Sequence, residues 1–205
     1  MATTDAQLTS TAHAVPLADP TDPADPVAAQ WCGAYELRTY RDADASACRK
    51  LYTDGLVAGQ LADNDSGLDI DDIAAAYLDE PGSHFWVAEV ARGHAEQAGS
   101  PDGTVVAMIG VQNHDEGIGE IRRLRVAEPH RRRRLGSRLL TTAVRFCRDH
   151  GCLKVALDTF VERSAAVRLF ERHQFVHGRT RQLHGKDTLY FYLDLYAQDH
   201  ADNGR

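Results

Sequence analysis

The pattern of hydrophobic and polar positions divides the chain into three parts. Residues 1–33 repeat Ala, Asp, Thr and Pro and carry few large apolar side chains, so we expect a disordered acidic tail there. From residue 34 to residue 197, apolar positions recur with the periods of strands and helices in turn, which predicts one folded domain. Residues 198–205 are again mostly polar, and we expect a flexible C-terminal tail.

Within the domain, alternating or compact apolar runs predict seven strands, and apolar residues at helical spacing predict four helices. The strands are expected at 35–40, 84–91, 104–112, 119–126, 154–160, 175–183 and 187–195. The helices are expected after a cap at Asp42 or Asp44, over 68–78, from about Gly136 to Gly151, and around Leu169. Elements in this order predict an α/β (α+β) fold: a mixed, mostly antiparallel central sheet flanked by helices on both faces.

Composition and charge exclude several classes of protein. No run approaches the roughly 18 apolar residues of a membrane span, and a secretory signal pattern is lacking, so we expect a cytoplasmic protein without membrane contact. The net charge of −7 argues against nucleic-acid binding by the whole surface. The four cysteines are scattered and the ten histidines lack metal-site spacing, which predicts reduced thiols and no metal.

The segment EIRRLRVAEPHRRRRLGSRLL, residues 120–140, carries the clearest chemical signal. A predicted strand ends at Val126 and leads through an arginine-rich loop into a helix that begins near Gly136. The exposed amides at a helix N-terminus carry a partial positive charge, and a loop of inward-facing amides can wrap a diphosphate. Arginine side chains beside them would add charge-assisted hydrogen bonds. We therefore expect an anion site at this junction.

From Glu120 to Phe175 the chain resembles the GNAT superfamily of acyl-CoA-dependent N-acetyltransferases, and among them the camello-like members. The family's diphosphate loop, Arg or Gln, any two, Gly, any, Gly or Ala, falls on residues 131–136. Its Leu-Asp-Thr strand appears at 157–159, and a later helix pattern appears as Arg163, Ala166, Leu169 and Phe170. The resemblance implies the GNAT fold for residues 34–197 and acetyl-CoA as the acyl donor.

Two departures from the family pattern bear on the site. Arg134 replaces the first loop glycine, and we expect an α-region backbone there, which would cost nothing. Phe170 replaces the tyrosine that protonates the departing sulfur in many relatives. Because a thiolate is a fair leaving group, turnover can persist, with the proton coming from solvent or from Tyr190 or Tyr192.

The resemblance implies direct attack of a neutral primary amine, from a small molecule or a protein, on the thioester. Glu120 is our candidate base, acting through a water. Amides near Leu124 and Val126 are candidates for binding the thioester carbonyl and the pantetheine. The full set of predicted donor-binding residues is Leu124, Arg125, Val126, Arg131, Arg132, Arg133, Arg134, Leu135, Gly136, Ser137, Arg138, Arg163 and Phe170. We expect a monomer or a homodimer.

Several alternatives stay open at this stage. Glu120 can be a base or only the partner of a nearby arginine, and Phe170 can stack on pantetheine or fill the core. The arginine run can bind phosphate, form a solvated or import-like patch, or contact nucleic acid. Acidic residues near the second helix can attract a cationic amine or serve as helix caps; they are Asp63, Asp65, Asp69, Asp71 and Asp72. The whole chain can be a catalytically silent acyl-CoA-binding regulatory module.

Overall fold

The computed structural model describes residues 34–56, 66–114, 117–183 and 186–196. The predicted tail over 1–33, the C-terminal tail, Asp63 and Asp65 lie outside these ranges. The strands are β1 (Tyr35–Thr39), β2 (His84–Val90), β3 (Val105–His114), β4 (Ile118–Val126), β5 (Lys154–Phe160), β6 (Val176–Leu183) and β7 (Lys186–Asp194). The α-helices are α1 (Ala45–Asp54), α2 (Leu68–Asp71), α3 (Ala95–Ala98), α4 (Leu135–Asp149) and α5 (Ser164–Arg172).

The strands form one seven-stranded sheet in the order β1-β2-β3-β4-β5-β7-β6. Every neighbouring pair is antiparallel except β4 and β5, which run parallel. The predicted mixed, mostly antiparallel sheet is therefore confirmed. The terminal strands pair as expected, but β7 lies between β5 and β6, an arrangement that depends on long-range pairing.

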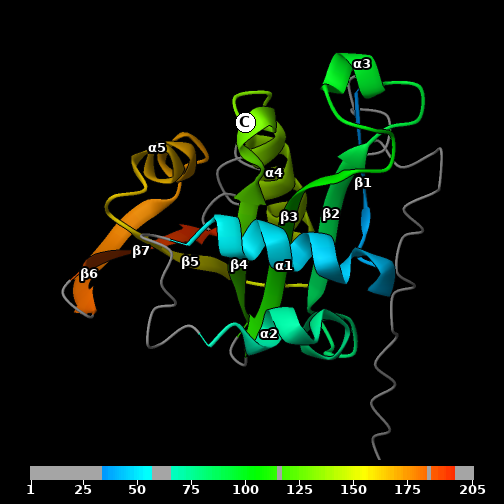
Figure 1. Ribbon diagram of the computed structural model, residues 1–205. Coiled ribbons are helices and arrows are strands. Elements are labelled where there is room, and N and C mark those ends of the chain that lie inside the picture. Colours follow the sequence, from blue (N-terminus) through cyan, green and yellow to red (C-terminus); the bar gives the residue numbers. More distant parts are fainter. Residues whose placement is uncertain (1–33, 57–65, 115–116, 184–185, 197–205) are drawn as a thin grey trace, which may run out of the picture.

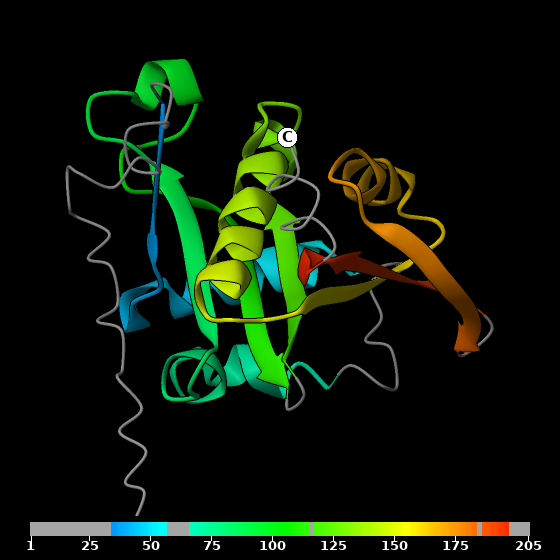
Figure 2. The same cartoon turned by 180° about the vertical axis from the view of Figure 1, so that it is seen from behind.

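Helices cover both faces of the sheet. Figures 1 and 2 show α1 and α2 crossing one face and α4 lying along the other, with α5 beside the β6–β7 end. The larger core lies under α4 and α5 and includes Leu139, Leu140 and Phe191. A smaller core lies under α1 and α2 and includes Tyr77 and Phe85. The alternation of strand side chains supplies both cores from one sheet.

The helix expected over 68–78 is wrong as a single element. α2 ends at Asp71, Asp72 has φ −142° and ψ 81°, and a π-helical turn follows over Ala74–Leu78. Asp72 also accepts a hydrogen bond from the Ala75 amide, as a cap does. The apolar spacing of the segment is kept, because Ile70, Ile73 and Tyr77 are all buried, so the break was hidden in the sequence pattern.

Candidate active site and donor loop

The β4–β5 pair separates in the middle of the sheet. Its ladder holds three residue pairs, and in the described residues the last one joins Glu120 to Ala156. Beyond this point β4 continues to Val126 beside β3, with a bulge where Arg123 takes φ 58°. The half of β4 that carries Leu124 and Val126 therefore has an edge that does not pair with β5. This is where we expected the thioester carbonyl and pantetheine to bind.

A cavity of about 510 Å³ opens at the same point of the sheet. It brings together the three predicted catalytic side chains, which come from β4 and β7. Its lining consists of His114, Ile118, Glu120, Lys154, Ala156, Leu157, Asp158, Gly178, Arg179, Tyr190, Phe191 and Tyr192. The volume is within the range of small-molecule sites, and a few polar groups converge on a partly apolar wall.

Glu120 is part of a short polar chain at the cavity wall. Its Oε2 lies 2.6 Å from His114 Nε2, and Arg122 is 4.0 Å away. Arg122 instead donates to Gln112 Oε1 at 3.0 Å. About a quarter of the Glu120 side chain is exposed, so water reaches the carboxylate. The carboxylate is thus paired chiefly with a histidine that also lines the cavity, and less with an arginine.

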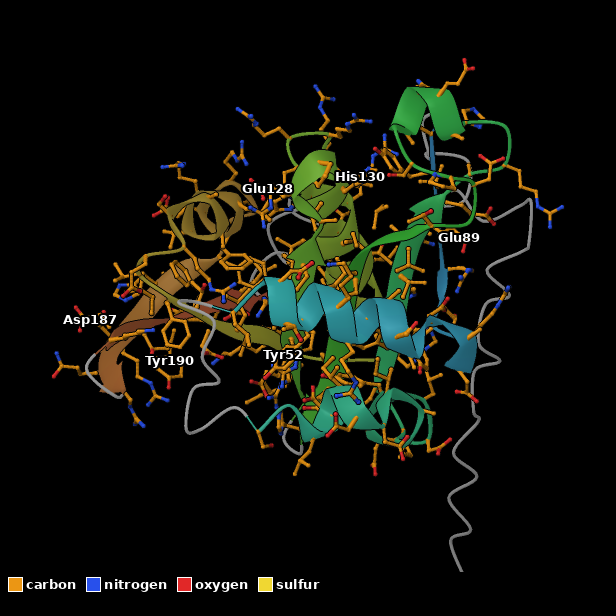
Figure 3. The ribbon with its side chains drawn as sticks, viewed as in Figure 1. Tyr52, Glu89, Glu128, His130, Asp187 and Tyr190 are labelled. Carbon is orange, nitrogen blue, oxygen red and sulfur yellow. The ribbon has the colours of Figure 1, made fainter. Side chains whose placement is uncertain are left out.

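Tyr190 and Tyr192 face the cavity because they alternate with Phe191 along β7, and Phe191 belongs to the core under α4 and α5. The guanidinium of Arg179 lies over the Tyr190 ring at 4.7 Å, and the Lys154 ammonium lies over the Tyr192 ring at 5.4 Å. Figure 3 shows Tyr190 near the β6–β7 end of the sheet. Both hydroxyl-bearing rings are therefore held in place by cations.

The predicted anion site is a strand-to-helix turn with unusual backbone geometry. Arg132 and Arg134 have φ values of 61° and 64°, and α4 begins directly after Arg134. The α-region conformation expected for Arg134 is wrong: the residue is left-handed, which costs a non-glycine residue about 1 kcal/mol. No side chain caps the N-terminus of α4, so the amides of its first turn have no side-chain acceptor in the described residues.

Gly136 lies in the first turn of α4 and faces the space between β4 and α5. An added Cβ would meet only Leu169 Cδ2 at 3.4 Å and Val126 Cγ2 at 3.9 Å, which are ordinary contacts. The protein itself therefore leaves room for a side chain here. An uncapped helix N-terminus beside an open glycine position fits a diphosphate group.

The arginine side chains of the loop have different surroundings. Arg131 Nε donates to the Val126 carbonyl at 3.1 Å. The Arg133 side chain turns back to β1 and α3, and together with Arg134 and Arg138 it lines a second cavity of about 340 Å³. All four arginines at 131–134 are exposed, and Arg131 and Arg133 are in addition tied to the fold by hydrogen bonds.

Other predicted donor-binding residues have roles within the fold. Phe170 is 5% exposed and packs against Phe175 and Phe191, so it belongs to the core. Ser137 Oγ lies 2.6 Å from His173 Nε2, which joins α4 to the end of α5. Leu135 is 2% exposed and belongs to the core. Two more meet at the end of α1: Arg163 donates to the Gly55 carbonyl at 2.6 Å, and Arg125 packs against Gly55.

The acidic residues near α2 hold the fold together. Asp69 accepts hydrogen bonds from Arg123 Nε at 2.7 Å and from the Tyr77 hydroxyl at 2.6 Å. Burial alone would raise the pKa of Asp69, but these hydrogen bonds lower it below its usual value. Asp71 pairs with Arg49 at the surface. These contacts account for Asp69, Asp71 and the cap at Asp72 without an amine ligand.

His114 was missed by the sequence interpretation, although it contacts Glu120 and lines the cavity. It ends β3, and the antiparallel register of β3 with β4 places it opposite Ile118, two residues before Glu120. His114 and Glu120 are six residues apart in the sequence. This spacing indicates that their side chains are neighbours across a hairpin only when the position of the turn between them is known.

The profile of the Acetyltransferase (GNAT) family matches residues 46–175, which is more than half of the chain. The chain belongs to this family. The matched GNAT region runs from α1 to the residue before β6 and contains β4, the arginine loop and α5. The resemblance noted from residues 120–175 is therefore confirmed.

The chain aligns with curated relatives over about half of its length. The chain is 32% identical over 117 residues to a probable N-acetyltransferase camello of Xenopus tropicalis, covering 56% of this chain and 48% of that protein. It is 33% identical over 112 residues to human N-acetyltransferase 8, covering 52% of this chain and 44% of that protein. The match thus spans about half the length of these relatives.

Solved GNAT structures share the fold over most of the chain. An acetyltransferase of the GNAT family from Staphylococcus aureus Mu50 aligns with a TM-score of 0.65 at 17% identity, covering 79% of this chain and 99% of the other. YncA, a putative acetyltransferase of Salmonella typhimurium solved with acetyl-CoA, aligns with a TM-score of 0.62 at 19% identity, covering 80% and 95%.

The described residues contain neither a candidate membrane span nor a candidate metal cluster. No helix there combines the length and apolar character needed to cross a membrane. No three or more His, Cys, Asp or Glu side chains gather there in a way that would hold a metal ion.

Proposed function

We propose that this GNAT protein transfers an acetyl group from acetyl-CoA to a primary amine, by direct attack of the amine on the thioester. The observation that carries the proposal is the position of Glu120. It lies at the last paired residue of β4, where the sheet separates, and on the wall of the cavity that also contains Tyr190 and Tyr192. A base, two hydroxyl groups and an unpaired strand edge thus meet at one point.

The uncapped N-terminus of α4 and the open position at Gly136 would hold the diphosphate of acetyl-CoA, with Arg134 and Arg138 nearby. This places the thioester toward the free edge of β4, whose amides near Leu124 and Val126 would stabilise the tetrahedral oxyanion. Holding both reactants in place supplies much of the rate enhancement in such a reaction.

Proton transfers would pass through the cavity wall. Glu120, oriented by His114, takes a proton from the acceptor ammonium through water, which leaves the amine lone pair free to attack. The amine nitrogen bonds to the thioester carbon, and the nitrogen loses its second proton to water. The carbon–sulfur bond then breaks and the thiolate takes a proton from Tyr190, Tyr192 or solvent; a tyrosine that gives its proton regains one from solvent. Phe170 has no part in this step because it lies in the core. The products are the acetamide and CoA.

Release of CoA thiol in the presence of an amine panel tests this proposal. The panel should include amino acids, polyamines, aminoglycosides and lysine peptides, with acetyl-CoA held near saturation. We expect at least one amine class to raise thiol release well above the amine-free rate. Binding of CoA without thiol release across the panel would instead favour a silent acyl-CoA-binding module, and no CoA binding at all would contradict both.

A further inference from the structure

A hydrogen-bonded cluster of four side chains lies behind the arginine loop, away from the cavity that contains Glu120. Tyr35 and His130 are buried, Ser100 is half-buried and Arg133 is exposed. His130 is 2% exposed and Tyr35 is 7% exposed. His130 Nδ1 lies 2.9 Å from the Tyr35 hydroxyl, and His130 Nε2 lies 3.1 Å from Ser100 Oγ. Arg133 NH1 lies 2.9 Å from the same Tyr35 hydroxyl. Figure 3 shows His130 near α3 and far from Tyr190.

Chemistry fixes the direction of one hydrogen bond in the cluster. Arginine only donates, so the Tyr35 oxygen accepts from Arg133. In a neutral His130 one ring nitrogen donates and the other accepts, so its bonds to Tyr35 and Ser100 run in opposite senses. Burial, together with the nearby Arg133 charge, lowers the pKa of His130 and favours this neutral form. The cluster is therefore one ordered chain from β1 to the loop.

Arg133 is fixed at further points. Its NH1 also donates to the carbonyls of Gln97 and Ala98 at 3.1 Å each. In the described residues, every hydrogen bond of this side chain goes to an uncharged oxygen, so no carboxylate neutralises the guanidinium. The positive charge stays beside the N-terminus of α4 and is available to attract an anion at longer range.

Arg133 also stands between the two left-handed residues of the loop, Arg132 and Arg134. Backbone conformations of this kind persist only where the surrounding structure imposes them. The Ala127 amide is bonded to Val106 at 2.8 Å and α4 starts at Leu135, which fixes both ends of the loop. The Arg133 side chain is the anchor between those ends.

We infer that Tyr35 and His130 are positioning residues for acetyl-CoA: through Arg133 they hold the loop in the shape that receives the diphosphate. The inference rests on the proposed function, because it assigns a role toward the same donor. Neither residue touches the acyl group or the acceptor amine. Their loss is therefore expected to weaken binding of donors that carry a diphosphate and to leave the chemical step unchanged.

The test compares Tyr35→Phe with the wild type in binding and in turnover. Calorimetric titration gives the Kd for CoA, and steady-state kinetics with an accepted amine gives KM and kcat for acetyl-CoA and for S-acetylpantetheine, which lacks the diphosphate. We expect Tyr35→Phe to raise Kd and KM for the CoA donors on the order of tenfold, because buried His130 and the Arg133 side chain lose their shared partner. We expect kcat to change less than about twofold and S-acetylpantetheine to be unaffected.

Two further variants make the test specific. Tyr40→Phe removes a hydroxyl from another buried tyrosine, just after β1, and should leave every one of these constants unchanged. His130→Ala should reproduce the Tyr35→Phe effect, whereas His130→Asn keeps an acceptor near the Nδ1 position and should restore most of the CoA affinity.

The outcomes separate this inference from the proposed function. If the wild type binds CoA and Tyr35→Phe binds it equally well, the inference is overturned while the proposed function stands. It is also overturned if KM rises equally for both donors, because that pattern reports a general loss of structure. If the wild type does not bind CoA, the proposed function fails and the inference falls with it.

Discussion

At the scale of single residues, the proposed acetyl transfer depends most on Glu120 and Gly136. Glu120 is hydrogen-bonded to His114, lies 4.0 Å from Arg122 and is also the carboxylate on the cavity wall, so a base and a partner of nearby side chains are not exclusive interpretations of this residue. Gly136 has space for a side chain that the protein does not use. Each residue therefore allows a substitution that fits the fold and affects only the proposed reaction.

Glu120→Gln is expected to lower kcat by about 10²-fold or more, because the amide cannot accept the proton of the acceptor ammonium. It should also remove the part of the pH profile of kcat/KM that reports ionisation of Glu120. His114→Asn is the control, since it keeps the carboxylate and should have a smaller effect. A pH–rate profile that Glu120→Gln does not alter would leave Glu120 as an ion-pair partner only.

Gly136→Val is expected to raise KM for acetyl-CoA by about tenfold, because the branched side chain would occupy the space assigned to the diphosphate. Ala165→Val is the control: Ala165 is exposed and is the second residue of α5, as Gly136 is of α4, so the same branched side chain is placed at the same helix position away from the loop. Steady-state kinetics on both variants checks this. An unchanged KM in Gly136→Val would mean that the diphosphate binds elsewhere.

At the scale of elements, α2 is held to the sheet by a buried ion pair. Arg123 leaves the bulge of β4, lies 5.0 Å above the Tyr52 ring centroid and bonds to Asp69, which Tyr77 also contacts. This contact joins α1, α2, the following π-helical turn and β4. The pair therefore fixes α2 against β4 close to the strand residues that follow Glu120.

Asp69→Asn is expected to lower the free energy of unfolding by about 3 kcal/mol, because it leaves the buried Arg123 charge without its carboxylate. Asp71→Asn is the control on the same helix. Its pair with Arg49 is about half exposed, so the change should be within about 1 kcal/mol. Urea denaturation at pH 7 measures both. Equal effects of the two substitutions would contradict the support assigned to Asp69.

The elements were predictable where a local period decides them. α4 follows from Leu139, Ala143 and Cys147, and the strands follow from their alternation. The break after Asp71 was not predictable, because the apolar spacing continues through it. The left-handed Arg134 was not predictable either, since loop closure between β4 and α4 imposes it against the preference of the residue.

The site was predictable to the extent that it lies in one stretch of sequence. Glu120 and the loop were found from residues 120–140. His114, Tyr35 and His130 entered only through register and packing, because their partners are remote in the chain or carry no spacing pattern. The insertion of β7 between β5 and β6, which brings Tyr190 and Tyr192 to the cavity, likewise depends on long-range pairing.

At the scale of the whole molecule, buried neutral histidines make stability depend on pH. Burial, with a smaller contribution from His150, lowers the pKa of His84 to about 4. The pKa values of His130 and His173 are also lowered, chiefly by burial. Each of the three therefore binds a proton less readily in the folded state than in the unfolded chain, where a histidine is protonated below about pH 6.5.

Stability is therefore expected to be complete above about pH 6.5 and to decrease as the pH falls toward 4. His84 alone accounts for a loss of about 3 kcal/mol over this window. Urea denaturation at pH 7, 6, 5 and 4.5 gives the slope, and His84→Gln should flatten it. A free energy of unfolding that is constant from pH 7 to 4.5 would contradict the burial of neutral histidines.

The three residue pairs between β4 and β5 join the β1–β4 part of the sheet to the β5–β7–β6 part. Gly119 lies in the middle pair of this ladder, and a methyl group there would lie 2.5 Å from Cys147 Sγ and 3.4 Å from Cys152 Sγ. The sulfur atoms of Cys147 and Cys152 thus fill the space behind this ladder. A side chain at position 119 would collide with Cys147 and push β4 out of its present position. The angle at which the two halves of the sheet separate, and the width left for a thioester, therefore depend on the absence of a Cβ at this residue.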